Sequence, residues 1–251
     1  MVDALLELAP AAFYLLVAAN LIVALATFVQ FTTGIGYAMI AMPLLALLDL
    51  TLVPGPALFT MLFLSLFMAF NGREHIHWPG FSPLLIGLLT GTALGTFALA
   101  TLNPTYFGIV FGALVLIAIV LGHFGLRPAA NTTTFATGGF CSGFMGTLSG
   151  IHGPVLAIVF HRLNGTAIRA TIAAVFVCAS TLSLLSLSTQ GFFGFDGIKK
   201  SLSLFPGLLI GIAMAFLGLK KISVSSAKIG MTTVATLSAL LLIANSIIGL
   251  H

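Results

Sequence analysis

The chain has 251 residues, of which 59% are hydrophobic and only 6% charged, with a formal net charge of +4. Soluble domains carry about 25% charged residues, so water could not solvate a folded surface of this composition. A soluble domain is therefore excluded. The basic residues stand in short loops between apolar stretches, so the net positive charge indicates membrane topology and does not indicate nucleic-acid binding.

Apolar stretches follow one another along nearly the whole chain, and about 20 apolar residues suffice for a helix to cross the hydrocarbon core. In chain order we expect helical segments near residues 11–31, 34–48, 54–70, 81–102, 106–122, 135–149, 151–161, 168–187, 202–219 and 231–250. The segments 34–48, 135–149 and 151–161 are too short to cross alone, and each adjoins a glycine-rich break. The pattern predicts an all-α integral membrane protein, a helical bundle in lipid.

Two short motifs recur in the same order in both halves of the chain. Gly34-Ile35 returns as Gly150-Ile151 at an offset of 116 residues, and the Leu-Leu-Ile-Gly run ending at Gly87 returns as the run ending at Gly211 at an offset of 124. Such self-similarity indicates duplication. We therefore expect one membrane domain made of two repeats, residues 1–127 and 128–251.

The loop cations indicate how the broken segments are folded. If each broken segment crossed the membrane once, the nine Lys and Arg would divide four to five between the two sides. If each turned back as a hairpin, only Lys199 and Lys200 would lie opposite the other seven, which are Arg73, Arg127, Arg162, Arg169, Lys220, Lys221 and Lys228. Cytoplasmic loops are enriched in Lys and Arg. The bias predicts two inverted repeats, each a re-entrant hairpin followed by three transmembrane helices, in a bacterial inner membrane with both termini on the non-cytoplasmic side.

The two breaks predict a site for an anion. Irregular backbone at membrane depth is tolerated only where protein or a water-filled cavity surrounds it. Helix N-termini after each break would direct N–H groups and positive dipole ends at a ligand. The candidate substrate-binding residues are Thr32, Thr33, Gly34, Gly36, Tyr37, Thr147, Ser149, Gly150, His152, Gly153 and Arg169. The alternatives stay open: the glycines could serve close helix packing, His152 could be a packing residue, and Arg169 could be an interfacial anchor.

The residue types absent from the expected spans limit the chemistry that the protein can perform there. No Asp or Glu falls within an expected span, which disfavours a carboxylate proton relay or a sodium site. We find no catalytic constellation and no metal-ligand set, and so expect a protein that is not an enzyme and binds no metal and no cofactor. Its expected partners are a small-molecule anion and the lipid bilayer, not nucleic acid. Whether it forms a homo-oligomer stays open.

Taken together, these motifs resemble the TauE/SafE family of sulfite exporters, also called TSUP, over nearly the whole chain. The resemblance lies in Phe31-Thr32-Thr33-Gly34-Ile35-Gly36 with Ala41-Met42-Pro43-Leu44-Leu45, in the run from Gly146 to Pro154, and in Arg169-Ala170-Thr171. It implies apolar helices in two related halves and transport of a sulfur-containing anion such as sulfite, thiosulfate, sulfoacetate or another organosulfonate. Tyr37 and His152 depart from the family's glycine-rich pattern, which leaves the exact ligand open.

Our leading hypothesis is a secondary transporter that exports such an anion from the cytoplasm. An inside-negative potential favours efflux of each negative charge by about 2.3 kcal/mol per 100 mV, so no coupling ion is needed. A second hypothesis is proton-coupled uptake of a sulfur-containing anion such as thiosulfate, with His152 carrying the proton. A third, from another class, is an intramembrane enzyme or a non-transporting membrane subunit.

Overall fold

The computed structural model describes residues 2–217 and 224–249 of the chain. Among these residues every regular element of secondary structure is a helix, and turns and loops connect the helices. The α-helices are α1 (Val2–Thr33), α2 (Tyr37–Leu48), α3 (Gly55–Asn71), α4 (Phe81–Thr101), α5 (Phe107–His123), α6 (Thr132–Ser149), α7 (Gly153–Val159), α8 (Gly165–Thr189), α9 (Phe195–Ser203), α10 (Phe205–Phe216) and α11 (Val224–Ile248). Short 3-10 turns, Leu50–Leu52, Arg73–His75 and Pro104–Tyr106, connect some of them. Lys220 and Lys221, counted in the charge bias, lie outside the described residues.

The described helices include enough long apolar segments for a multi-pass membrane protein. Six are long and apolar enough to cross a bilayer: Ala12–Thr33, Leu50–Asn71, Phe81–Thr101, Pro104–His123, Gly165–Thr189 and Ser226–Ile248. Helices α9 and α10 meet at a bend of 40° and make a seventh candidate if they count as one span. The predicted all-α membrane bundle is confirmed.

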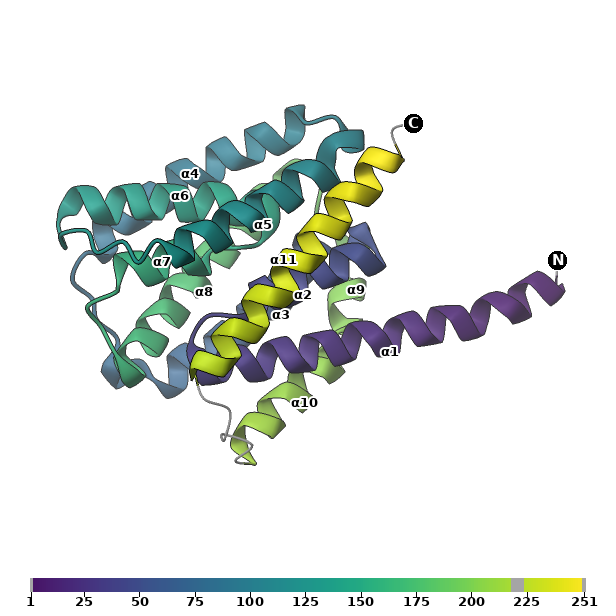
Figure 1. The fold of residues 1–251 in the computed structure, drawn as a ribbon, viewed down its shortest axis with the longest axis horizontal. Helices are drawn as coiled ribbons and strands as arrows, with labels where there is room; N and C mark the ends of the chain where they lie inside the picture. The colour runs from purple at the N-terminus through teal and green to yellow at the C-terminus, as the bar shows by residue number, and fades with distance from the viewer. Residues whose placement is uncertain (1, 218–223, 250–251) are drawn as a thin grey trace.

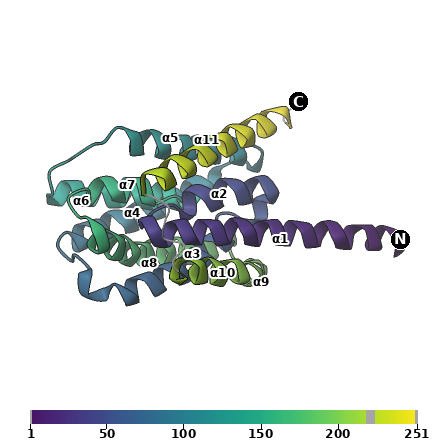
Figure 2. The same ribbon diagram turned by 60° about the horizontal axis from the view of Figure 1, so that its bottom comes forward.

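At both predicted breaks the chain reverses its direction. Helix α2 runs back alongside α1 and does not extend it (Figures 1 and 2). After α6, Nδ1 of His152 lies 2.9 Å from the carbonyl oxygen of Ser142, ten residues earlier in the chain. Helix α7 accordingly packs against α6. Each short helix thus folds back on the long helix that precedes it.

Glycines bring helices of the two halves of the chain into close contact. Helix α4 packs against α6, and α1 packs against α10. A Cβ on Gly87 of α4 would lie 2.0 Å from the carbonyl oxygen of Ala136, and one on Gly139 of α6 would lie 2.1 Å from that of Leu84. Small residues allow such backbone approach in membrane bundles. Helices α3 and α8 form a third contacting pair across the halves, and α5 and α11 a fourth.

The connections between helices gather at two opposite sides of the bundle. In Figure 1 the α3–α4, α5–α6 and α7–α8 connections lie at the left, while the α4–α5 connection and the C-terminal end of α11 lie at the right. Arg73, Arg127 and Arg162 belong to the left-hand connections, which we call the basic side. Lys199 and Lys200 lie in α9, toward the right. The N-terminal end of α1 and the C-terminal end of α11 both lie on the side opposite the basic one (Figure 1).

Several element boundaries differ from those expected. Helix α6 begins at Thr132 and not near 135, because the side chain of Asn131 accepts a hydrogen bond from the N–H of Thr134 at 2.8 Å and caps the helix. The segment expected from 202 begins at Phe195 and is divided into α9 and α10. Pro206 stands in the first turn of α10, where a proline loses no helical hydrogen bond, so a helix starts readily there.

Candidate functional site

The first break is closed by two glycines and one glutamine. Gly34 has φ +84° and Gly36 has φ +149°, conformations that other residues rarely adopt. The Gln30 amide donates to the carbonyl oxygen of Gly34 at 2.9 Å, and its side-chain oxygen accepts from the N–H of Tyr37 at 3.0 Å. The first N–H of α2, which we expected to face a ligand, is therefore satisfied by Gln30.

The second break is closed by a glycine and a buried histidine. Gly150 has φ +73°, and its N–H donates to the carbonyl oxygen of Gly146 at 2.7 Å. His152 is fully buried, and because the oxygen of Ser142 can only accept, Nδ1 of His152 carries the hydrogen and donates it at 2.9 Å. Its Nε2 has no hydrogen-bond partner within the described chain. A Cβ on Gly146 would lie 2.0 Å from Nδ1, so only glycine leaves room for this ring.

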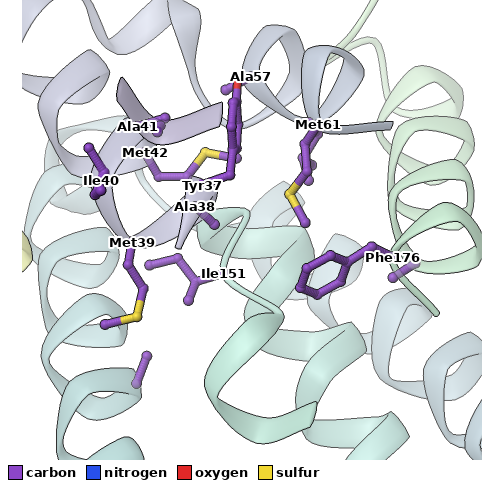
Figure 3. Packing of buried hydrophobic residues seen from close by; sticks show 14 of the residues in the cluster. Tyr37, Ala38, Met39, Ile40, Ala41, Met42, Ala57, Met61, Ile151 and Phe176 are labelled. Atoms are coloured by element: carbon purple, nitrogen blue, oxygen red, sulfur yellow. The ribbon is translucent and has the colours of Figure 1, made fainter. Parts of the chain in front are cut away.

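The two breaks touch each other in the core of the bundle. A Cβ on Gly153 would lie 3.4 Å from Cγ2 of Ile35, and one on Gly150 would lie 2.2 Å from Cε of Met42. Figure 3 shows Ile151 of the second break beside Met39 of α2. The two breaks are therefore in contact, and apolar side chains fill the contact.

The four candidate hydroxyl groups all bond to their own helices. Each donates to the carbonyl oxygen four residues earlier: Thr32 to Phe28 at 2.9 Å, Thr33 to Val29 at 2.8 Å, Thr147 to Gly143 at 2.8 Å and Ser149 to Met145 at 2.8 Å. In this arrangement their hydrogens are not directed at a ligand. A hydroxyl would have to rotate away from its carbonyl before it could donate to an anion.

Arg169 lies against the first break from the start of α8. Its Cγ is 2.8 Å from where a Cβ on Gly34 would stand, and its side chain lines a cavity of about 180 Å³ together with Asn71, His75 and Thr166. The ion pair found within the described chain joins Lys199 to Asp196 and does not involve Arg169. Among the described residues no carboxylate pairs with this guanidinium.

A larger cavity on the basic side borders both breaks, and we call it the basic cavity. Its volume is about 600 Å³. Ile35 and Met39 from the first break and Pro154 from the second form its apolar floor. Its wall carries the basic side chains of His123, Arg127, His161, Arg162 and Lys228, and no Asp or Glu is among the described residues that line it.

The cations of the basic cavity have no carboxylate partner among the described residues, where the ion pair is Lys199 with Asp196. Nδ1 of His123 lies 3.0 Å from the oxygen of Ile119, and Nδ1 of His161 lies 2.9 Å from that of Ile158. Both rings therefore donate through Nδ1 to backbone. A recess lined by charges of one sign concentrates ions of the opposite sign. The arrangement is suited to collecting a small anion.

The predicted site residues are not part of the wall of this cavity. None of the eleven is among its lining residues, whereas their chain neighbours Ile35 and Pro154 are. The sequence interpretation treated Arg127, Arg162 and Lys228 only as markers of topology. The signal that pointed to them was their basic charge near the ends of helices on one side of the expected topology, together with the lack of acidic residues near them.

Comparison with known proteins shows the family of this chain. The family model described as sulfite exporter TauE/SafE matches residues 19–242, which include both breaks. The chain belongs to the TauE/SafE family. A curated relative of this TauE/SafE chain, a probable sulfite/organosulfonate exporter TauE of Cupriavidus necator, is 28% identical over 176 residues, covering 66% of this chain and 69% of the relative. No solved structure matches the chain. As a TauE/SafE member with several apolar spans, it is a multi-pass protein of a transporter family.

Proposed function

We propose that this chain is a secondary transporter that exports a small sulfur-containing anion, sulfite or an organosulfonate, from the bacterial cytoplasm. The observation that carries the proposal is the basic cavity, in which three cations without carboxylate partners stand beside the two breaks. Its volume of about 600 Å³ lies within the range of small-molecule sites. The name of the curated relative and the family description support the substrate class.

The charges on the two sides support export as the direction of transport. Cytoplasmic loops carry an excess of Lys and Arg, so the basic side faces the cytoplasm and both termini lie outside. The basic cavity is then the entrance for an intracellular anion. An inside-negative potential favours the exit of each negative charge by about 2.3 kcal/mol per 100 mV, so export needs no coupled ion.

We also propose that residues 1–127 and 128–251 form inverted repeats around this site. Gly34 and Gly150 support it, since each ends a helix in the left-handed region and bonds the carbonyl four residues before it at 2.7 Å. Gly87 and Gly211 support it as well, since each packs against the backbone of the first helix of the opposite half, at Ala136 and Ala24 respectively.

The experiment is efflux of labelled sulfite from proteoliposomes containing the wild type, Arg162→Gln or Lys199→Gln. Arg162 lines the basic cavity, whereas Lys199 lies in α9 outside it, so each variant removes one positive charge from a different side. We expect Arg162→Gln to raise the half-saturating sulfite concentration roughly tenfold, about 1.4 kcal/mol, and Lys199→Gln to behave as wild type. Absence of sulfite and organosulfonate flux in the wild type would refute export of these anions.

The buried histidine favours a second candidate, proton-coupled uptake. Nε2 of His152 has no hydrogen-bond partner within the described chain and could take up a proton. In that case anion flux would follow an imposed pH gradient and would lose this dependence in His152→Gln. Flux that follows the membrane potential alone, in both proteins, rules out the coupling.

A further inference from the structure

A second cavity opens on the side opposite the basic one, between the other ends of the same three helices. The basic cavity is lined by the start of α2 and its preceding break, the end of α5 and the start of α11. The second cavity has a volume of about 500 Å³ and is lined by the end of α2, the start of α5 and the end of α11. We call it the distal cavity. Its polar side chains are Asp49, Thr105, Asn245 and Ser246.

The two cavities are separated by a short apolar layer. On α5, ten residues separate Gly108 of the distal cavity from Ala118 of the basic cavity, which corresponds to about 15 Å of helix. On α11, the same spacing separates Leu242 from Thr232. The buried large or apolar side chains of the intervening stretches are Phe111, Val115, Ala235 and Ala239, and Ser238 is buried beside them. A path along these helices is therefore open at both ends and closed in the middle.

Helices α5 and α11 meet at the outer end of this path through glycines. A Cβ on Gly108 would lie 2.1 Å from Oγ of Ser246, and one on Gly112 would lie 2.6 Å from Cγ1 of Ile243 and 2.9 Å from the carbonyl oxygen of Ala239. Gly108 and Ser246 also line the distal cavity. The long side chains of α11 nearest these two glycines are Leu242 and Ile243, and the other nearest atoms belong to Ser246 and to backbone. Parting the two helices here therefore separates few long side chains.

The charges of the two cavities are of opposite sign. Asp49 is the acidic residue of the distal cavity, and the described residues that line this cavity include no Lys, Arg or His. Partial burial raises the pKa of Asp49, but hydrogen bonds from the hydroxyl and N–H of Thr51 and the charge of Lys200 outweigh it and hold the pKa below its ordinary value. Asp49 is therefore ionised at neutral pH and weakens anion binding at this end.

We infer that the distal cavity is the outer vestibule from which the exported anion is released, and that it connects to the basic cavity when α5 and α11 separate at Gly108 and Gly112. The inference rests on the proposed function and adds to it an exit route with a gate. The exported anion is collected among cations on one side and released past a carboxylate on the other.

The test is a reversible cross-link across the gate, in protein whose own thiols are removed by Cys141→Ser and Cys178→Ser. In this background we combine Gly108→Cys with Ser246→Cys. The Cβ position at Gly108 lies 3.3 Å from Cβ of Ser246, close to the separation of about 3.8 Å in a disulfide. Sulfite cleaves disulfides, so the substrate in this assay is sulfoacetate, an organosulfonate that leaves them intact. Oxidation should form the cross-link and reduce sulfoacetate efflux from proteoliposomes to that of protein-free liposomes. A reductant should restore efflux, and sulfoacetate should still stabilise the cross-linked protein against heat, since the basic cavity is untouched.

The matched control is Thr96→Cys with Ser186→Cys, which joins α4 to α8 away from the gate. The two hydroxyl oxygens are 2.7 Å apart, so this pair should also form a disulfide, and efflux should persist after oxidation. Continued efflux through the oxidised Gly108–Ser246 pair, loss of efflux in both pairs, or failure of that pair to cross-link would each overturn the gate. If the reduced proteins transport no sulfoacetate and the wild type transports neither sulfoacetate nor sulfite, the proposed function fails instead.

Discussion

Gln30 joins both ends of the first break through one side chain. It bonds the carbonyl oxygen of Gly34 and the N–H of Tyr37, both within the bundle. We expect Gln30→Leu to lower the free energy of unfolding by about 1–3 kcal/mol for each group left unpaired, measured as the apparent unfolding temperature of the purified protein in detergent. The control is Thr236→Val, whose hydroxyl bonds only a carbonyl of its own helix. Equal unfolding temperatures for Gln30→Leu and the wild type would contradict the capping role.

The ring of His152 occupies the space beside Gly146. Since a Cβ at Gly146 would lie 1.8 Å from Cε1 of His152, Gly146→Ala should displace the ring and destabilise the protein by about 1–3 kcal/mol. Adding His152→Ala removes the ring that the new methyl group strikes. A double-mutant cycle measured by thermal unfolding should therefore show the double variant losing less than the sum of the single variants. Additive losses would mean that the two residues do not compete for this space.

At the scale of the element, contact between α4 and α6 depends on backbone approach. A Cβ on Gly139 would lie 2.1 Å from the carbonyl oxygen of Leu84, and backbone cannot rotate away as a side chain can. Gly139→Ala should force the helices apart and destabilise the protein by about 1–3 kcal/mol, measured by thermal unfolding.

The matched control for this contact is Gly230→Ala in α11. No described atom lies within 4 Å of where its Cβ would stand, and alanine favours a helix over glycine by about 1 kcal/mol. This variant should be as stable as the wild type or slightly more stable. If the two alanine variants behave alike, glycine at position 139 is not required by the α4–α6 contact.

The positions of the two breaks could be predicted from sequence because glycine marks them locally. Gly34 and Gly150 both adopt the left-handed region that ends a helix. The capping role of Gln30 could not be predicted from sequence. Its side-chain amide lies seven residues from Tyr37 in the chain and reaches the N–H of Tyr37 only because the chain reverses between them. The early start of α9 was missed for another reason: Lys199 and Lys200 interrupt the apolar pattern although the helix continues through them.

At the scale of the whole molecule, the basic cavity is the feature that sequence could not place. Arg127, Arg162 and Lys228 come from three separate parts of the chain, and only the packing of α5, α7 and α11 brings them around one space. The charge bias of the loops indicated which side they share. The charge bias did not indicate that these three residues line the basic cavity, because loop charges alone do not specify a cavity.

The most direct test of the account is whether the cations of the basic cavity hold the anion. We would measure the unfolding temperature of the purified protein against sulfite concentration, since a ligand that binds only the native state stabilises it. The wild type should be stabilised, and so should a control that loses three charges elsewhere, Arg73→Gln/Lys199→Gln/Lys200→Gln. Arg127→Gln/Arg162→Gln/Lys228→Gln should show no stabilisation in the same concentration range. Equal stabilisation of this variant and the wild type would contradict the account.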